Sequence, residues 1–319
     1  MLTDECFDVV VVGGGAAGLS AALTFGRAGR STVVLDNGMP RNRFAAHMQG
    51  FLSRDGLPPA DMLAIGREDV ERYGVQIYAV TAESAQWDDT RRIAAVRLTD
   101  GSTIEGRRLL VTTGLTDELP DIPGIAERWG KDVIHCPYCH GYEVRQQAIG
   151  VLVTGEGSLH QAFLFRQWTE DLTVFTHTRS IEPAMRERLA SRDVTVIDGM
   201  VRRLVLDPDN RHLTGFELHS GRIVARQAIV VAPTLSANAS ILAAMDTEIE
   251  RTDYGSRVVT DRMGRTSIPG IYAAGNVADP MTQVMAAAAS GTMTAAAING
   301  DLMNEDFDRA EAARAAILS

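Results

Sequence analysis

The chain has 319 residues, of which 45% are hydrophobic and 23% charged, a composition typical of a globular protein with room for two domains. Its net charge of −10 and its scattered Lys and Arg residues argue against nucleic acid as a partner, because phosphate binding needs a concentrated basic surface. The longest apolar run, from Val9, is too short and glycine-rich to span a membrane, and the acidic N-terminus does not resemble a secretory signal. We therefore expect a cytoplasmic protein.

The first third of the chain predicts a strand–helix–strand unit followed by shorter strands. Its apolar runs and their periodicity favour strands and helices in this order: strand 7–12, helix 16–28, strand 31–35, and strands at 73–80, 93–98 and 108–113. Asp100-Gly101 predicts a hairpin turn. The first unit is long enough for a parallel crossover.

The remainder of the chain repeats this design. A segment with two prolines, 117–123, is interpreted as a linker. Beyond it the predicted elements are strand 148–154 with its turn, a helix within 155–168, strands 171–176 and 227–232, a strand entering a glycine turn at 268–278, and helix 282–298. We infer an α/β protein of two doubly wound domains: a discontinuous nucleotide domain (1–116 and 236–319) and an inserted domain (117–235).

The first glycine turn has the pattern of a dinucleotide site. Gly13, Gly15 and Gly18 fit G-x-G-x-x-G between a hydrophobic strand and a helix, with Ala16 and Ala17 between the last two glycines. The glycines permit a tight turn, close approach of a diphosphate and close helix packing, and the helix N-terminus favours the diphosphate charge. Asp36 stands where an acid would bind ribose hydroxyls. FAD and NAD both remain compatible with this pattern.

A cysteine pair in the middle of the chain carries the chemistry. The run from His135 to His140 places Cys136 and Cys139 three residues apart, close enough to form a disulfide, with a histidine on either side that could move a proton at neutral pH. A zinc site is the alternative, but it needs four ligands and the chain has no second cysteine pair. We favour redox chemistry and expect no metal. The third cysteine, Cys6, is expected to be an inert buried thiol.

In order, the motifs VVGGGAAGLSAA, CPYC and TSIPGIYAAGNV resemble the low-molecular-weight thioredoxin reductase family over nearly the whole chain. The resemblance implies a thioredoxin reductase-like fold of two Rossmann-like domains, bound FAD and a homodimer. It also implies flavin-site positions. Those beyond the first glycine turn and Asp36 are Asn37, Gly38, Arg41, Arg43, His47, Val80, Thr112, Gly114, Gly275, Asn276, Gln283 and Val284. Asn276 stands where an aspartate is usual in the family.

Two departures from a thioredoxin reductase change the expected direction of electron flow. The second glycine turn, 155–160, has His160 where a glycine or alanine would allow close packing and Glu156 where diphosphate charge would lie. The strand that follows is not succeeded by the paired arginines expected for NADPH. These departures argue against the use of NADPH.

The second departure is His140, which replaces the family's aspartate after the second cysteine. The run CPYCHGYE, the segment 40–44 and His47 resemble a narrower branch, the FAD-dependent dithiol oxidases that close disulfides in gliotoxin, holomycin and romidepsin. The resemblance implies that a small-molecule dithiol gives electrons to the cysteine pair and that O2 receives them, forming H2O2. Cys136 would be the attacked sulfur, Cys139 the flavin-proximal thiol, and His140 the base, with His135 as the weaker candidate.

Two other functions remain open from the sequence. One is a thioredoxin reductase-like disulfide reductase supplied by NADPH or ferredoxin, which the altered second turn opposes only for NADPH. The other is a nucleotide-binding sensor without turnover, which has no need of a cysteine pair.

Overall fold

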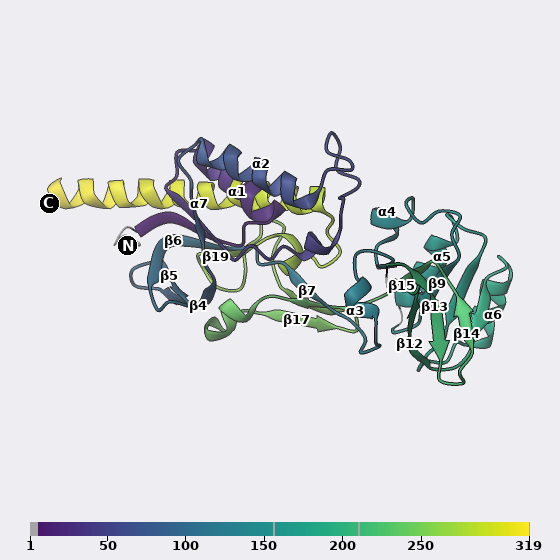
Figure 1. Ribbon diagram of the computed structural model, residues 1–319. Coiled ribbons are helices and arrows are strands. Elements are labelled where there is room, and N and C mark those ends of the chain that lie inside the picture. The colour runs from purple at the N-terminus through teal and green to yellow at the C-terminus, as the bar shows by residue number, and fades with distance from the viewer. Residues whose placement is uncertain (1–5, 156, 210, 319) are drawn as a thin grey trace.

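The computed structural model describes residues 6–155, 157–209 and 211–318. Figure 1 shows two lobes: one contains the N-terminal strand and the C-terminal helix, and the other contains the middle of the chain. Two strands, one on each side of the middle segment, run between the lobes. Among the described helices, none is long and apolar enough to cross a membrane. The α/β architecture with two doubly wound sheets agrees with the prediction, and the boundaries at 116/117 and 235/236 stay a prediction.

The first lobe is built on a sheet with the strand order β3-β2-β1-β6-β5-β4 and with β19 beside β6. Its strands are β1 (Cys6–Val12), β2 (Thr32–Asp36), β3 (Gln76–Ala79), β4 (Ala82–Asp88), β5 (Ile93–Leu98), β6 (Thr103–Val111) and β19 (Ile271–Ala273). The strands β3, β2, β1, β6 and β19 are parallel, and the predicted hairpin joins β5 to β6. The pairing of β19 with β6 brings the chain back into the first lobe after the middle segment.

The valine run of strand β1 determines where the first glycine turn lies. Val9 and Val11 pack in one core and Val10 and Val12 in the other, so both faces of the strand are buried. A parallel strand covered on both faces has such a continuous apolar run. The turn that follows Val12 therefore lies at the carboxyl edge of the parallel strands, where ligands of doubly wound sheets bind.

In the part of this lobe that the structure describes, the α-helices are α1 (Ala16–Arg27), α2 (Pro59–Glu71) and α7 (Val284–Leu318), and the short 3-10 helices are η1 (Arg41–Phe44), η2 (Ser240–Met245) and η3 (Gly275–Val277). A four-stranded sheet lies toward the other lobe, formed by β7 (Leu115–Glu118), β16 (Thr234–Ala237), β17 (Ile249–Thr252) and β18 (Gly255–Val258). The predicted linker is thus wrong at its start, because β7 pairs antiparallel with β16.

Helix α7 continues far beyond the predicted end at residue 298 and projects from the lobe (Figure 1). Asn299-Gly300 suggests a helix end in the sequence. The continuing helix instead carries Asp301 and Glu305, whose carboxylates lie 2.6 and 2.5 Å from the fully buried guanidinium of Arg108 on β6. These charge-assisted contacts hold the helix to the sheet past the glycine. No local pattern reveals them.

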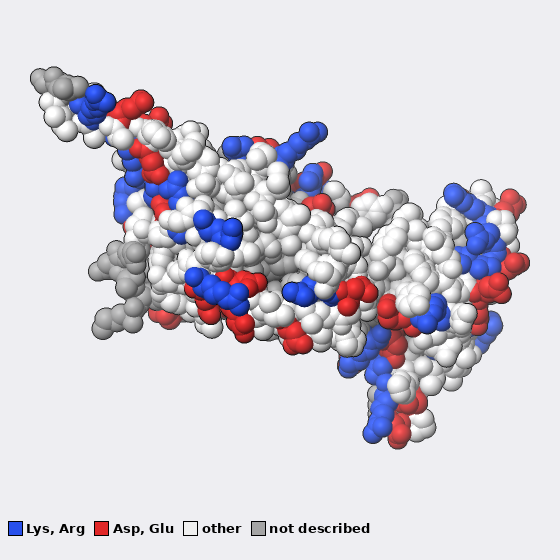
Figure 2. Space-filling model, turned by 90° about the horizontal axis from the view of Figure 1, so that it is seen from above, with Lys and Arg blue, Asp and Glu red and all other residues white. Residues whose placement is uncertain are grey.

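The second lobe holds a parallel sheet in the order β11-β10-β9-β15-β8 and an antiparallel three-stranded sheet, β12-β13-β14. The strands are β8 (Val133–Ile134), β9 (Ile149–Leu152), β10 (Leu172–Phe175), β11 (Thr195–Ile197), β12 (Val201–Leu206), β13 (Leu213–Leu218), β14 (Ile223–Ala225) and β15 (Ala228–Val231). The helices are α3 (Ile125–Arg128), α4 (Pro137–His140), α5 (Gly157–Phe165) and α6 (Pro183–Ala190). Figure 2 shows basic and acidic side chains interspersed on one face of both lobes, with no continuous basic stripe there.

Candidate functional site

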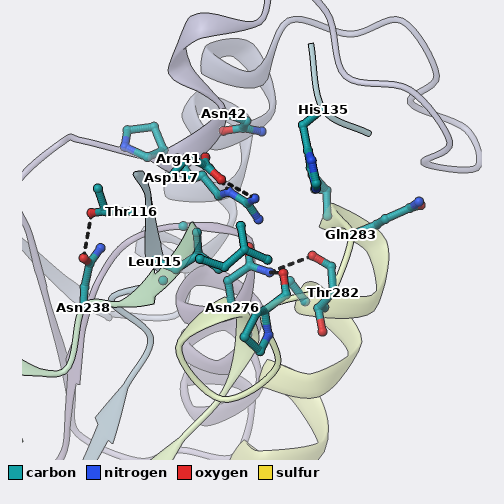
Figure 3. Close-up of a pocket in the computed structure, with 18 of the residues that line it drawn as sticks. Arg41, Asn42, Leu115, Thr116, Asp117, His135, Asn238, Asn276, Thr282 and Gln283 are labelled. Carbon is teal, nitrogen blue, oxygen red and sulfur yellow. Dashed lines mark hydrogen bonds and ion pairs between the residues drawn. The ribbon is translucent and has the colours of Figure 1, made fainter. Parts of the chain in front are cut away.

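A cavity of about 1660 Å³ lies between the two lobes and is lined by residues of both. From the first lobe it receives the glycine turn after β1, the loop after β2 and the start of α7. From the second lobe it receives the cysteine pair and one side of α5. Figure 3 shows Arg41 and Asp117 beside Asn276, with His135 extending toward them, whereas the Gln283 side chain points away from them. Nearly all residues predicted for the flavin site or the redox site therefore border one cavity.

The first glycine turn requires its glycines for identifiable reasons. Gly13 has φ +107°, and a Cβ placed there would lie 2.5 Å from the carbonyl oxygen of Thr112. A Cβ on Gly18 would overlap the carbonyl oxygen of Gly13, whereas one on Gly15 meets no atom within 4 Å because it would enter the cavity. Ala16 and Ala17 also line the cavity. The turn is thus open to a ligand at Gly15, and Gly18 contributes packing rather than contact.

The loop after β2 brings charged groups to the cavity. Asp36 lines it and is paired with Arg67 of α2, whose Nη2 lies 2.9 Å from its Oδ2. Asn37 also lines the cavity, but Gly38 does not. Gly38 borders a separate small pocket, so its assignment to the flavin site is not supported by position.

The predicted residues Arg41, Arg43, His47 and Val80 all line the cavity. Arg41 forms a two-pronged ion pair with Asp117 of β7, at 2.9 and 2.6 Å, and Asp117 is nine-tenths buried. Arg43 lies over the Phe44 ring, and His47 Nδ1 is 3.0 Å from the Gly56 carbonyl oxygen. Asp117 was missed because it lies in the predicted linker.

Asn276 gains a role that an aspartate could not fill. Its amide nitrogen lies 2.8 Å from the carbonyl oxygen of Thr282, and the carbonyl oxygens of Asp279 and Pro280 are 3.2 and 3.3 Å away. A carboxylate cannot donate to carbonyl oxygens. The side chain therefore fastens the loop that carries Gln283 into α7. Gly275, Gln283, Val284, Thr112 and Gly114 line the cavity too.

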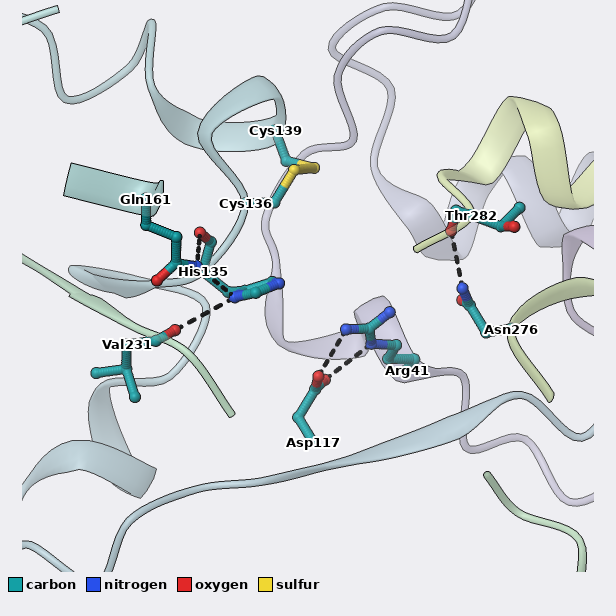
Figure 4. The surroundings of a disulfide bond; sticks show 9 residues. All are labelled: Arg41, Asp117, His135, Cys136, Cys139, Gln161, Val231, Asn276 and Thr282. Atoms are coloured by element: carbon teal, nitrogen blue, oxygen red, sulfur yellow. Dashed lines mark hydrogen bonds and ion pairs between the residues drawn. A yellow bond between two sulfur atoms is a disulfide. The ribbon is translucent and has the colours of Figure 1, made fainter. Parts of the chain in front are cut away.

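The cysteine pair forms a disulfide at the second lobe's edge of the cavity. Cys136 and Cys139 are bonded with their Cα atoms 5.2 Å apart, and Cys136 stands at the start of α4 (Figure 4). This confirms that the spacing permits a disulfide. Cys6 is the first residue of β1 and is exposed, so the expectation of a buried thiol there is wrong. Among the described residues, no group of three or more His, Cys, Asp and Glu side chains is arranged to hold a metal ion.

Both flanking histidines line the cavity, and burial lowers the pKa of each. For His135, the positive charge of Arg41 also lowers the pKa. Its Nδ1 lies 2.7 Å from Nε2 of Gln161, a residue that the sequence reasoning missed. His140 has a buried Nδ1 without a hydrogen-bond partner among the described residues. A buried imidazole favours its neutral form, because desolvation penalises the charge.

The second glycine turn differs from its prediction in register. The β1–β2 pairing ends with Val12 opposite Leu35 and the β9–β10 pairing with Leu152 opposite Phe175, which is an offset of 140 residues. The same offset aligns the fully buried Phe25 and Phe165. The counterpart of Gly18 is therefore the buried Ser158, and the assignment of that position to His160 is wrong, because His160 is exposed.

In the same alignment, Val153 corresponds to Gly13 and Gly155 corresponds to Gly15. Only one of the three glycines of the first turn thus has a glycine counterpart. Ser158 Oγ accepts hydrogen bonds from the backbone N–H groups of Thr154 and Gly155, at 3.1 and 3.3 Å. Glu156, whose charge was expected to oppose a diphosphate, lies outside the described residues.

A glycine turn for a dinucleotide and a cysteine-pair disulfide thus face one cavity. The family model described as pyridine nucleotide-disulphide oxidoreductase matches residues 7–291. The chain belongs to this family. It is consequently an oxidoreductase of a family of flavoproteins, and its fold is thioredoxin reductase-like.

The most informative relatives cover almost the entire chain. "Thioredoxin reductase sirT" of Leptosphaeria maculans is 29% identical, over 94% of this chain and 96% of its own. The crystal structure of HlmI is 43% identical with a TM-score of 0.94, covering 100% of this chain and 99% of that one. An oxidoreductase from Agrobacterium tumefaciens is 35% identical with a TM-score of 0.88, covering 94% and 99%.

Proposed function

We propose that this oxidoreductase is an FAD-dependent dithiol oxidase, which closes a disulfide within a small molecule and passes the electrons to O2. The observation that carries the proposal is the position of the Cys136–Cys139 disulfide on the same cavity as the first glycine turn. The likeness of the chain to HlmI and to sirT supports its assignment to this branch of the family. The resemblance of the run CPYCHGYE to the dithiol oxidases supports the same assignment.

FAD fits the first lobe on structural grounds. The space in front of Gly15 is open, and the N-terminus of α1 begins directly after it, so a diphosphate can approach the backbone N–H groups. Asp36 keeps its second oxygen for a ribose hydroxyl while its first pairs with Arg67. Asn276 and Gln283 would hold the flavin end, and they line the same cavity as the disulfide. When bound, the flavin supplies a two-electron acceptor that O2 can reoxidise, with H2O2 as the product.

The chemistry of the chain itself is thiol–disulfide exchange. A substrate thiolate attacks Cys136 Sγ, the Cys136–Cys139 bond breaks, and Cys139 leaves as a thiolate. The second substrate thiol loses its proton to His140 and attacks the substrate sulfur of the mixed disulfide, which releases Cys136. The substrate has then lost two electrons and two protons, and the cysteine pair has gained the two electrons. Neutral His140 suits the role of base, because burial keeps its pKa below the ordinary value.

The second glycine turn supports electron entry from a dithiol rather than from a pyridine nucleotide. Val153 and Ser158 replace two glycines, and the turn's N–H groups are bonded to Ser158 Oγ instead of facing a ligand. In addition, Tyr254 from the first lobe lies over the turn: a Cβ on Gly157 would be 3.1 Å from its Cε1. A diphosphate would have to displace this ring.

The second candidate is a disulfide reductase that draws electrons from another donor, such as ferredoxin. The likeness to sirT, which is named a thioredoxin reductase, favours it. The two candidates use the same cysteines in opposite directions, so reduction of a protein disulfide with reduced ferredoxin present would identify the reductase.

Oxygen uptake with a small dithiol tests the oxidase directly. We expect Cys136→Ser and Cys139→Ser each to lower the turnover rate by more than about 1000-fold, because neither retains a disulfide to exchange. FAD content should not change. Cys6→Ser is the matched control and should behave as the unaltered protein, since Cys6 is remote from the pair in the fold. Turnover that survives either active-site substitution would refute the mechanism.

A homodimer completes the proposal. The outer part of α7 projects from its lobe with Met303 and Phe307 exposed, which leaves apolar surface for a second copy (Figure 1). The molar mass measured by light scattering after size-exclusion chromatography would decide between a monomer and a dimer.

A further inference from the structure

One side of α5 faces the cavity and the other packs against the parallel sheet. Gly157, His160, Gln161 and Leu164 line the cavity at helical spacing, while Ala162 and Phe165 are buried in the core. Gln161 is on the border between the two sides and is 6% exposed. A buried amide at this position needs hydrogen-bond partners. Its Nε2 finds two on the residue just before the disulfide, whereas its Oε1 has no partner among the described residues.

The amide of Gln161 is oriented by a backbone carbonyl. Its Nε2 lies 2.9 Å from the carbonyl oxygen of His135, and only the NH2 end of an amide can donate to a carbonyl oxygen. The same Nε2 lies 2.7 Å from His135 Nδ1. With two hydrogens, the nitrogen can donate to both acceptors. In this arrangement His135 Nδ1 must hold a lone pair, and the ring proton of the neutral histidine must be on Nε2.

A second contact asks for the opposite tautomer. The carbonyl oxygen of Val231 lies 3.3 Å from the same Nδ1 and would accept a proton from it (Figure 4). The Gln161 contact is shorter, and its donor is fixed by the backbone carbonyl of His135. An Nδ1–H group would also point at the amide hydrogens of Gln161. The geometry therefore favours the Nε2–H tautomer.

We propose that Gln161 is a positioning residue, which holds neutral His135 with its proton on Nε2 and so presents an N–H donor to the cavity beside the Cys136–Cys139 disulfide. The ligand class for this donor is an anionic sulfur, the thiolate that is released when the disulfide opens. This inference rests on the proposed dithiol exchange. It removes His135 from the role of base, because protonation at Nδ1 would break the Gln161 hydrogen bond, and it leaves that role to His140.

The charges around His135 are compatible with a neutral ring. Arg41, Asp117 and His140 are the charged or titratable groups that act on it, and Arg41 and Asp117 are paired with each other. Burial lowers the pKa of His135, and the Arg41 charge lowers it further. A hydrogen bond from Nε2–H to a thiolate would lower the basicity of that sulfur and improve it as a leaving group.

The test is the imidazole nitrogen chemical shifts of histidine in the 15N-labelled holoenzyme, because these shifts distinguish the two neutral tautomers. The chain has seven histidines, and His135→Asn assigns the signal. We expect Nε2–H in the unaltered protein and Nδ1–H, bonded to the Val231 carbonyl oxygen, in Gln161→Leu. Nδ1–H in the unaltered protein, or no change of tautomer in Gln161→Leu, would overturn the inference.

Kinetics supply a second readout. Gln161→Leu should slow anaerobic electron transfer from a dithiol about tenfold, the scale of one lost hydrogen bond to a charged group. Gln161→Glu should raise the pKa of His135 and add a pH dependence that the unaltered protein lacks. Gln167→Leu is the control: Gln167 is exposed just after α5 and should leave rate and tautomer unchanged. A tautomer that responds without any dithiol oxidation would refute the proposed function alone, whereas normal turnover with an unresponsive tautomer would refute this inference alone.

Discussion

The two glycine turns of this chain begin from one design and differ in what occupies the space in front of them. In the first, Gly13 and Gly18 make the turn compact, and the space before Gly15 is open to the cavity. In the second, Ser158 Oγ takes the turn's own N–H groups, and the Tyr254 ring lies against Gly157. The fold has been kept in both places, but only the first retains the features of a dinucleotide site.

This difference shows that a strand–turn–helix unit does not itself imply a bound nucleotide. Anion binding needs unsatisfied backbone N–H groups and space for the ligand. A single hydroxyl can satisfy those groups from within, and a ring from another part of the chain can fill the space. We expect alanine substitutions to differ in the size of their effect at the two turns.

The largest expected effect is at Gly13. Gly13→Ala forces a side chain into a positive φ and against the Thr112 carbonyl oxygen, which should lower the free energy of unfolding by about 3 kcal/mol or more and release the flavin. Gly155→Ala is the matched control, because a Cβ there meets no atom within 4 Å. It should change the free energy of unfolding by less than about 1 kcal/mol. Urea unfolding and flavin content measure both, and equal losses would refute the contrast.

A smaller effect is expected at Ser158. Ser158→Ala removes the acceptor of the Thr154 and Gly155 N–H groups, which should lower the free energy of unfolding by about 1–2 kcal/mol. The freed N–H groups should not create an NADPH site, because Tyr254 still lies over the turn. Denaturant unfolding gives the first quantity and calorimetric titration with NADPH the second. Tight NADPH binding by the variant would mean that the hydroxyl alone had closed the site.

The smallest effect is the pH dependence of stability around the disulfide. Burial lowers the pKa of His140 in the folded chain, so the unfolded chain binds a proton first as the pH falls below the ordinary histidine value of about 6.5. The free energy of unfolding should therefore decrease as the pH falls from about 6.5 toward the folded-state pKa. For one histidine the decrease is at most about 1.4 kcal/mol per pH unit. Above that range, both states are neutral and the contribution disappears.

Replacing the group isolates its share. His140→Gln should flatten the fall in the free energy of unfolding below about pH 6.5. The exposed His212 offers the control variant His212→Gln, which should leave the curve unchanged. An identical slope in the His140 variant and the unaltered protein would show that His140 is not held neutral by the fold.

Much of the fold and site could be predicted because the decisive signals are local. Each of these signals predicts the structure of the segment that contains it: the valine run of β1, the glycines that follow it, and the spacing of Cys136 and Cys139. The pairing of β7 with β16 and the hold of Arg108 on α7 join residues far apart in sequence, so no window of sequence contains them. The same reason hid Asp117 and Gln161, which lie beside Arg41 and His135 only after folding. Matching the glycine motif by sequence alone also assigned the position of the third glycine to His160, whereas the strand register assigns it to Ser158.

The central claim is tested most directly by anaerobic mixing of the FAD-loaded protein with a small dithiol or with NADPH. The visible absorbance of the flavin is the readout. If electrons enter through the cysteine pair, the dithiol should bleach the flavin and NADPH should leave it oxidised, and Cys139→Ser should abolish the response to the dithiol. Rapid bleaching by NADPH alone would contradict the account, because it would show that the second glycine turn still serves as a nucleotide site.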